Sequence, residues 1–296
     1  MRVVIDTNSL ETTELSFFLG CSSEHAAVVP SHSAAEIFRP NSNEAIFSAF
    51  GTLCSFPKQV IVLKENRIAN RVDPSSPAIS NHFIDKTATR KFPEFCNILH
   101  DATDGDGSYL NQIALRRRWA IERIENMRQS FGNLEEELAE LGSNFTDNEL
   151  YQLRSGNRLL NLTKQKILAI TTSLAGQMYG EQFRGRRLFP PPYRYNHFVW
   201  RYTLAHIVRL MCHLKSGAKR RASKKAANDH FDNVFATFGT YFNGVMSNDR
   251  EMLATQHIMR TILSSLSVRL APDYISSGYI EKLIERHRKD PLRDVT

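Results

Sequence analysis

The N-terminal part of the chain alternates between short apolar runs and segments with helical spacing, and this alternation limits the fold more than any other feature. Residues 2–5 and 26–29 consist mainly of valine, isoleucine and alanine, as expected for short buried strands. Helical spacing follows over residues 8–19, with Gly20 as a plausible stop, and a helix start follows over 33–38. Strands that alternate with helices predict an α/β fold with a parallel sheet covered on both faces.

The middle of the chain is richer in helical patterns. Apolar residues recur at helical spacing in long segments, among them 44–56, 109–130, 148–177 and 197–214. One apolar run at 59–63 predicts a strand within this region. The strand–helix pattern then returns near the C-terminus, where a short strand at 244–247 precedes a helix over 251–266, and one more helix is expected over 273–288.

These patterns suggest a core assembled from both ends of the chain. We expect residues 1–40 and 226–296 to form a discontinuous α/β core. Residues 41–225 would form a mostly helical insertion, parts of which complete the core. The alternative is two independent domains with a boundary near the proline-rich loop at 189–195, where consecutive prolines exclude regular helix.

Charge and composition narrow the class of protein. The formal net charge of +7 favours an anionic partner, nucleic acid first. The four cysteines are far apart and form no pair with zinc-site spacing, so we expect reduced thiols in a cytoplasmic protein. No apolar stretch approaches the roughly 20 residues that cross a bilayer, so we expect no membrane association.

Carboxylates occur near the ends of the predicted strands. Asp6 ends the first strand, Glu36 begins the helix after the second, and Asp249 follows the last. Asp229 and Asp232 lie near the start of a phenylalanine-rich helix. The carboxyl ends of parallel strands meet at one edge of a sheet, where carboxylates would repel each other unless a cation neutralised them. Oxygen ligands suit Mg²⁺ or Mn²⁺, and two such ions can drive hydrolysis of a phosphodiester.

Together, these acids resemble the pattern of the PIN-domain nucleases. The matching motifs are Asp6-Thr7-Asn8, Glu36 in VVPSHSAAEIF, an acid that opens a helix, and Ser247-Asn248-Asp249. The family keeps a short spacing between its third and fourth acids, so the resemblance favours Asp232 over Asp229 as the third. The resemblance covers residues 1–40 and 226–266, and the stretch between Glu36 and Asp232 is much longer than in compact members of the family.

The resemblance implies a three-layer α/β/α domain with a parallel central sheet and the activity of a metal-dependent endoribonuclease. Asp6, Glu36, Asp232 and Asp249 would be the catalytic acids and would hold one or two Mg²⁺ or Mn²⁺ ions, with Asp229 as a further candidate ligand. Cleavage of RNA would leave 5′-phosphate and 3′-hydroxyl ends. By the same resemblance the protein could act as a toxin or defence effector, with an antitoxin or regulatory protein as partner, or as a homo-oligomer.

Neighbouring residues fit supporting roles in such a site. Asn8, Ser247 and Asn248 carry amides and a hydroxyl that could orient carboxylates, although ordinary turn chemistry would explain them equally well. Each acid also has a structural alternative. Asp6 and Asp249 could cap helices, and Ser33 to Glu36 has the sequence of a capping box.

Basic residues near these acids could bind the phosphates of a nucleic acid. The candidates for nucleic-acid binding are Arg39, Lys219, Arg220, Arg221, Lys224 and Lys225. A solvated loop is the structural alternative for the basic run over residues 215–225. Two other functions stay open at this point: a non-catalytic RNA-binding or assembly protein on a PIN-like scaffold, and a structure-specific DNA nuclease with the same acids.

Overall fold

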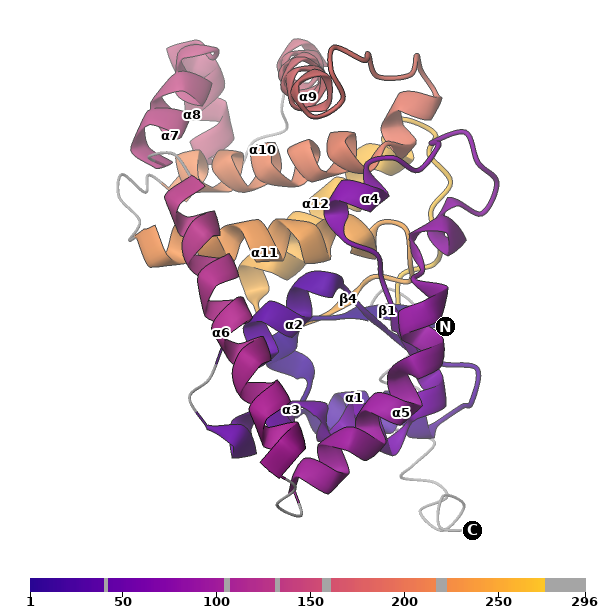
Figure 1. The fold of residues 1–296 in the computed structure, drawn as a ribbon. Coiled ribbons are helices and arrows are strands. Elements are labelled where there is room, and N and C mark those ends of the chain that lie inside the picture. The colour runs from indigo at the N-terminus through magenta and orange to yellow at the C-terminus, as the bar shows by residue number, and fades with distance from the viewer. Residues whose placement is uncertain (40–41, 104–106, 131–133, 156–160, 217–222, 275–296) are drawn as a thin grey trace.

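A computed structural model describes the chain except for residues 40–41, 104–106, 131–133, 156–160, 217–222 and 275–296. Figure 1 shows the sheet near the middle of the molecule, with α10, α11 and α12 stacked on one side and α1, α3 and α5 on the other. The fold is thus α/β with a large share of helix. No described helix is both long and apolar enough to cross a membrane.

Four parallel strands form the sheet. They are β1 (Arg2–Ile5), β2 (Ala26–Val29), β3 (Val60–Val62) and β4 (Val245–Met246), in the spatial order β3-β2-β1-β4. All three pairs of neighbours are parallel, which confirms the expected parallel sheet. β3 comes from the predicted insertion and pairs with β2, so this stretch supplies an edge strand of the sheet.

The pairing of β1 with β4 joins residues from the two ends of the chain. The backbone N–H of Val4 donates to the carbonyl of Gly244, and the N–H of Asp6 donates to the carbonyl of Met246, both at 3.0 Å. Gly244 has a φ of +100°, and a β-carbon there would lie 2.5 Å from Asp273 Oδ1, so only glycine fits. This register places Asp6 beside the residue that follows β4.

Two short helical segments follow β1. A 3-10 helix, η1 (Thr7–Ser9), leads to α1 (Thr13–Gly20), and the hydroxyl of Thr12 accepts a hydrogen bond from the N–H of Leu15. The prediction of one helix over 8–19 is therefore wrong at its start. A threonine cap fixes the first turn of α1 at residue 13, while the residues after Asp6 turn tightly at the sheet edge.

Helices make up most of the remaining chain. They are α2 (Ser31–Ile37), α3 (Asn43–Ser55), α4 (Asn66–Ala69), α5 (Lys86–Thr103), α6 (Gly107–Ser130), α7 (Leu134–Ser143), α8 (Asp147–Ser155), α9 (Asn161–Gln182), α10 (Phe198–Ser216), α11 (Ser223–Gly239) and α12 (Arg250–Ser265). Short 3-10 turns are η2 (Pro57–Gln59), η3 (Ile79–Phe83) and η4 (Tyr193–Asn196). The helical spacing over 148–177 corresponds to α8 and α9 in the residues that the structure describes. Most of the helix predicted over 273–288 lies outside the described residues.

The main core lies around the sheet. α11 packs against β1 and contributes the buried side chains of Phe231, Val234, Phe235 and Phe238, which share one helical face. Burial of this face fixes the rotation of α11 and so the direction of its polar residues. A separate small cluster joins α7 and α9 to α10, and consists of Leu141, Phe145, Ile167, Ile207, Leu210 and Met211.

The cysteine prediction is wrong for one pair. Cys54 on α3 and Cys96 on α5 form a disulfide, with their α-carbons 5.3 Å apart. The two residues are 42 positions apart in the sequence, so only the packing of α3 against α5 brings them together. Spacing arguments recognise closely spaced cysteine motifs and do not detect a pair of this kind.

Candidate functional site

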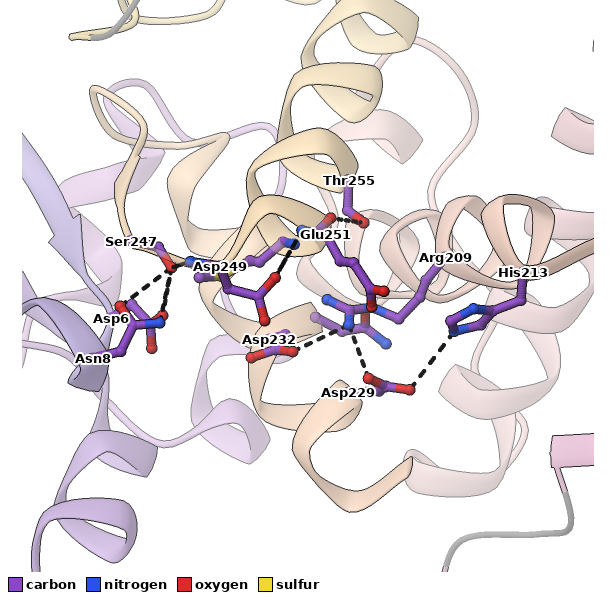
Figure 2. Close-up of polar contacts among 12 residues, drawn as sticks. Asp6, Asn8, Arg209, His213, Asp229, Asp232, Ser247, Asp249, Glu251 and Thr255 are labelled. Carbon is purple, nitrogen blue, oxygen red and sulfur yellow. Dashed lines mark hydrogen bonds and ion pairs between the residues drawn. The ribbon is translucent and has the colours of Figure 1, made fainter. Parts of the chain in front are cut away.

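Asp6 lies at the carboxyl ends of β1 and β4, and three polar residues surround it. The Ser247 hydroxyl donates to Asp6 Oδ2 at 2.6 Å, and the Asn8 amide donates to Ser247 Oγ at 3.2 Å. The N–H of Asn248 donates to Asn8 Oδ1 at 3.0 Å. Figure 2 shows these side chains grouped at the strand ends. Asp6 is only 4% exposed, so the surrounding hydrogen bonds hold its carboxylate in a defined position.

Glu36 meets Asp6 through a threonine. The Thr7 hydroxyl donates to Glu36 Oε2 at 3.0 Å and lies 3.4 Å from Asp6 Oδ1. The capping-box alternative for Glu36 is wrong, because α2 begins at Ser31 after a cap at Pro30 and Glu36 belongs to its last turn. The cap alternative for Asp6 also fails, since its side chain makes no capping hydrogen bond to η1.

Asp249 does serve as a helix cap. Its Oδ1 accepts hydrogen bonds from the N–H groups of Glu251 and Met252 at 2.7 and 3.1 Å, at the start of α12. Its own N–H donates to Ser247 Oγ at 2.9 Å, which ties the cap to the Asp6 cluster. Both capping bonds fall on one oxygen, and the other oxygen of Asp249 has no hydrogen bond within the described part of the chain.

An arginine from α10 holds the two aspartates of α11. Arg209 Nη1 lies 2.9 Å from Asp229 Oδ1 and 3.1 Å from Asp232 Oδ2, and Arg209 Nε donates to Asn233 Oδ1. Asp229 also approaches His213, at 3.8 Å. In Figure 2 the carboxylates of Asp232 and Asp249 point toward the same space, whereas Asp229 is turned toward Arg209 and His213. This arrangement favours Asp232 over Asp229 as the third acid.

The electrostatics of the carboxylates link them as one cluster. Burial raises the pKa of Glu36 to about 8, and repulsion from Asp6 and then Asp232 adds to the shift. Burial also raises the pKa of Asp232 to about 7, opposed by Arg209 and reinforced by Asp6 and Asp249. The pKa of Asp6 is raised by burial, while the Ser247 hydroxyl lowers it. Each of these three acids is thus affected by other members of the predicted set.

The predicted basic residues are described only in part. Arg39 is exposed, two positions after the end of α2, and its positive charge lowers the pKa of Glu36. Lys219, Arg220 and Arg221 lie outside the described residues. Lys224 and Lys225 belong to the first turn of α11, but their side chains also lie outside the description. Arg39 is thus the predicted basic residue whose side chain the structure describes, and its link to the acids is this electrostatic effect on Glu36.

Two residues of the cluster were not singled out by the sequence analysis. Thr7 bridges Asp6 and Glu36, and Arg209 neutralises part of the charge on α11. Arg209 is only 3% exposed, although it belongs to the strongly apolar helix α10. An arginine within an otherwise apolar helical face needs a buried acidic partner, and that signal could have identified it.

The donors of the cluster fit a hard cation in kind. They are carboxylate oxygens with hydroxyl and amide oxygens beside them, the donor set that Mg²⁺ and Mn²⁺ take. Among the described residues, no group of three or more His, Cys, Asp or Glu side chains is drawn together closely enough to hold a metal ion as it stands. Repulsion between the carboxylates explains why they stay apart at this edge of the sheet and bond to hydroxyls and to an arginine instead.

Comparison with known proteins adds no assignment. No protein-family model, no curated protein sequence and no solved structure matches this chain. An inference about function therefore depends on the chemistry of the acidic cluster and on the motifs that carry the PIN-domain resemblance.

Proposed function

We propose that this chain is a metal-dependent endoribonuclease with a PIN-like, three-layer α/β/α core. The observation that carries the proposal is the acidic cluster at the carboxyl edge of the sheet, where the Thr7 hydroxyl links Asp6 to Glu36 and the Ser247 hydroxyl links Asp6 to the backbone of Asp249. The charges of Asp6 and Asp249 also raise the pKa of Asp232. The four acids come from separate parts of the fold: Asp6 follows β1, Glu36 and Asp232 lie on α2 and α11, and Asp249 caps α12.

The charge arrangement supports a cation-binding role. Desolvation raises the pKa values of Asp6, Glu36 and Asp232, and strongly perturbed pKa values cluster at functional sites. Asp6, Glu36, Asp232 and Asp249 would hold the ion, and Asp229 would help to set the position of Arg209. When bound, Mg²⁺ or Mn²⁺ would polarise the scissile phosphate and promote attack by water.

The protein's own residues would orient the acids and the RNA. Ser247 and Thr7 hold the carboxylates of Asp6 and Glu36 through their hydroxyls. Arg209 keeps Asp232 on the cluster side of α11. Arg39 is exposed beside Glu36 and would contact an RNA phosphate, because its guanidinium suits phosphate oxygens. RNA is preferred here over DNA because of the resemblance, and the assay compares the two directly.

The proposal is tested by cleavage assays. Purified protein is incubated with labelled mixed-sequence RNA and with single-stranded DNA, in Mn²⁺, in Mg²⁺ or in EDTA. We expect cleavage of RNA only with metal, with 5′-phosphate ends on the products. Asp6→Asn and Glu36→Gln should each reduce the rate about a hundredfold or more, since each removes a ligand charge. The matched controls Asp101→Asn and Glu44→Gln, both at exposed positions, should retain activity.

The outcomes separate the alternatives. Cleavage that persists in EDTA or in Asp6→Asn would contradict the metal mechanism. Cleavage of DNA in preference to RNA would assign the chain as a DNA nuclease. RNA cleavage that requires metal but is unaffected by Glu36→Gln would show that Glu36 is not a ligand. The remaining acids would then be the metal ligands.

A further inference from the structure

A groove lies between α3 and α5, and residues of these two helices form its wall. Figure 1 shows the two helices together on one side of the sheet. The volume of the groove is about 360 Å³, which is within the usual range for small-molecule sites, about 300–1,000 Å³. The apolar part of the wall includes Phe47, Phe50 and Leu99, and the polar part includes Ser55, Asn97 and His100.

Both residues of the Cys54–Cys96 disulfide line this groove. Cys54 is half-buried, whereas Cys96 is only 8% exposed. The rate of exchange between a thiol and a disulfide depends on access to the sulfur that is attacked. A small thiol that enters the groove would therefore reach the disulfide at Cys54 more easily than at Cys96.

A glycine keeps the groove open beside Cys54. Gly51 belongs to α3, lines the groove and lies one helical turn before Cys54. A β-carbon at this position would have no heavy atom within 4 Å, so it would extend into open space. Glycine is unfavourable within a helix because it loses more conformational freedom than any other residue. Here, the absence of a side chain leaves the approach to Cys54 clear.

Other contacts between the two helices do not depend on the disulfide. The ring of Phe50 on α3 meets the ring of Phe95 on α5 edge-on, with 5.0 Å between the ring centroids. Phe50 and Leu99 are both buried in the main core. These contacts would hold Cys54 and Cys96 near each other after the disulfide opens, so the bond could form again.

We propose that the Cys54–Cys96 disulfide is a reversible redox site, at which a small peptide-like thiol forms a mixed disulfide with Cys54. The thiolate of the small molecule would attack Cys54 Sγ, the bond between the two protein sulfurs would break, and Cys96 would leave as a thiolate that takes a proton. A second thiol would then attack the sulfur of the first, which releases a small disulfide and frees the Cys54 thiol. Two electrons thus pass from two small thiols to the protein disulfide.

The polar part of the wall suits a thiol that carries peptide groups. Ser55 and Asn97 are exposed, and their hydroxyl and amide can bond to peptide N–H and C=O groups. His100 lies one helical turn after Cys96 on α5, and its protonated ring would stabilise a thiolate at Cys96. In the part of the chain that the structure describes, no carboxylate lines the groove, so a thiol with carboxylates of its own would meet none there.

Glutathione is the probe that tests this inference. The oxidised full chain is incubated with reduced glutathione, free thiols are trapped with iodoacetamide, and each cysteine is followed over time by peptide mapping. We expect glutathione on Cys54 and a trapped thiol on Cys96 before both become thiols. Gly51→Phe should slow the reaction about tenfold or more, because the ring would cover the approach to Cys54. The matched control Gly176→Phe, at a glycine of α9 that also borders open space, should react at the wild-type rate.

Two further variants separate the cysteines. Cys96→Ser leaves Cys54 without the thiol that would displace bound glutathione, so oxidised glutathione should modify Cys54 and release reduced glutathione. Cys54→Ser leaves the buried Cys96, which should react about tenfold more slowly. Circular dichroism checks each variant for folding.

Repeating the reaction in urea below the unfolding transition shows which state of the chain reacts. A rate that rises steeply with urea would mean that glutathione reacts only with unfolded chains, and this would overturn the inference. Equal rates for the wild type and Gly51→Phe would also overturn it, as would glutathione on Cys96 in place of Cys54. None of these readouts uses nuclease activity, so they are independent of the proposed function.

Discussion

At the scale of single residues, the acidic cluster combines groups that stabilise the fold with groups that strain it. Asp249 caps α12 and therefore has a structural use in addition to any ligand role. Glu36 differs, because its main partners are Thr7, which stabilises its charge, and Asp6, which opposes it. Substitutions at Glu36 and at Asp249 should thus have opposite effects on stability.

Glu36→Gln should make the metal-free protein more stable at alkaline pH. The folded pKa of about 8 exceeds the ordinary value of 4.5, so the folded state binds the proton more tightly than the unfolded state between these values. The stability of the wild type should therefore fall as the pH rises from about 4.5 to 8, and that of the variant should not fall for this reason. We expect a difference of about 1–3 kcal/mol at pH 8 and little at pH 5.

Urea unfolding in EDTA at pH 5 and pH 8 measures this difference. Glu44→Gln is the control, since Glu44 is exposed on α3. A Glu36→Gln variant that is less stable than the wild type at pH 8 would show that the carboxylate has a structural role.

Arg209→Met should be strongly destabilising. The substitution leaves Asp229 and Asp232 without their shared cation in a largely buried position. Loss of one partner from a buried ion pair typically costs about 3–5 kcal/mol. Urea unfolding at pH 7 checks the value, with exposed Arg90→Met as the matched control. An equal, small effect of both substitutions would mean that Arg209 does not compensate the aspartates.

At the scale of elements, the positions of strands were easier to predict than the contacts between helices. The strands β1 and β2 occupy the predicted residues, because short β-branched and alanine-rich runs between polar segments are distinctive. The strand predicted at 244–247 is present as β4, although it is only two residues long. Its pairing depends on Gly244 and on hydrogen bonds to β1, which a local pattern cannot reveal.

Part of the site could be predicted for the same reason. The pairing of the strands fixes the positions of residues that directly follow them, such as Asp6 and Ser247. Thr7 was overlooked because its role depends on where α2 places Glu36. Arg209 was overlooked because a sequence does not say which face of α10 meets α11. Both depend on packing between elements that are distant in the chain.

The disulfide between α3 and α5 should stabilise the oxidised protein. Its loop spans 42 positions, for which the chain-entropy estimate is an upper value of about 4 kcal/mol. Cys54→Ser should lower the free energy of unfolding by about 2–4 kcal/mol under oxidising conditions. Guanidinium unfolding with and without dithiothreitol checks this. If the reductant lowers the stability of the wild type no more than that of Cys54→Ser, the disulfide does not contribute in solution.

At the scale of the whole molecule, a metal bound only by the folded state should raise the temperature of unfolding. A concentration of Mn²⁺ one hundred times the Kd should contribute about 2.7 kcal/mol. Differential scanning fluorimetry with Mn²⁺ or EDTA measures the shift, which we expect to be several degrees. The shift should disappear in the double variant Glu36→Gln/Asp232→Asn and persist in Glu44→Gln. The same shift in all three proteins would place the ion elsewhere.

The pairing of β1 with β4 has a consequence for synthesis of the chain. The hydrogen bond between Ser247 and Asp6 joins residues 241 positions apart, and Asp249 follows two residues later. During translation, the acidic cluster therefore stays incomplete until the residues up to Asp249 have left the ribosome. A nuclease built in this order would be inactive while these residues are made, when its messenger RNA and the ribosomal RNA are close at hand.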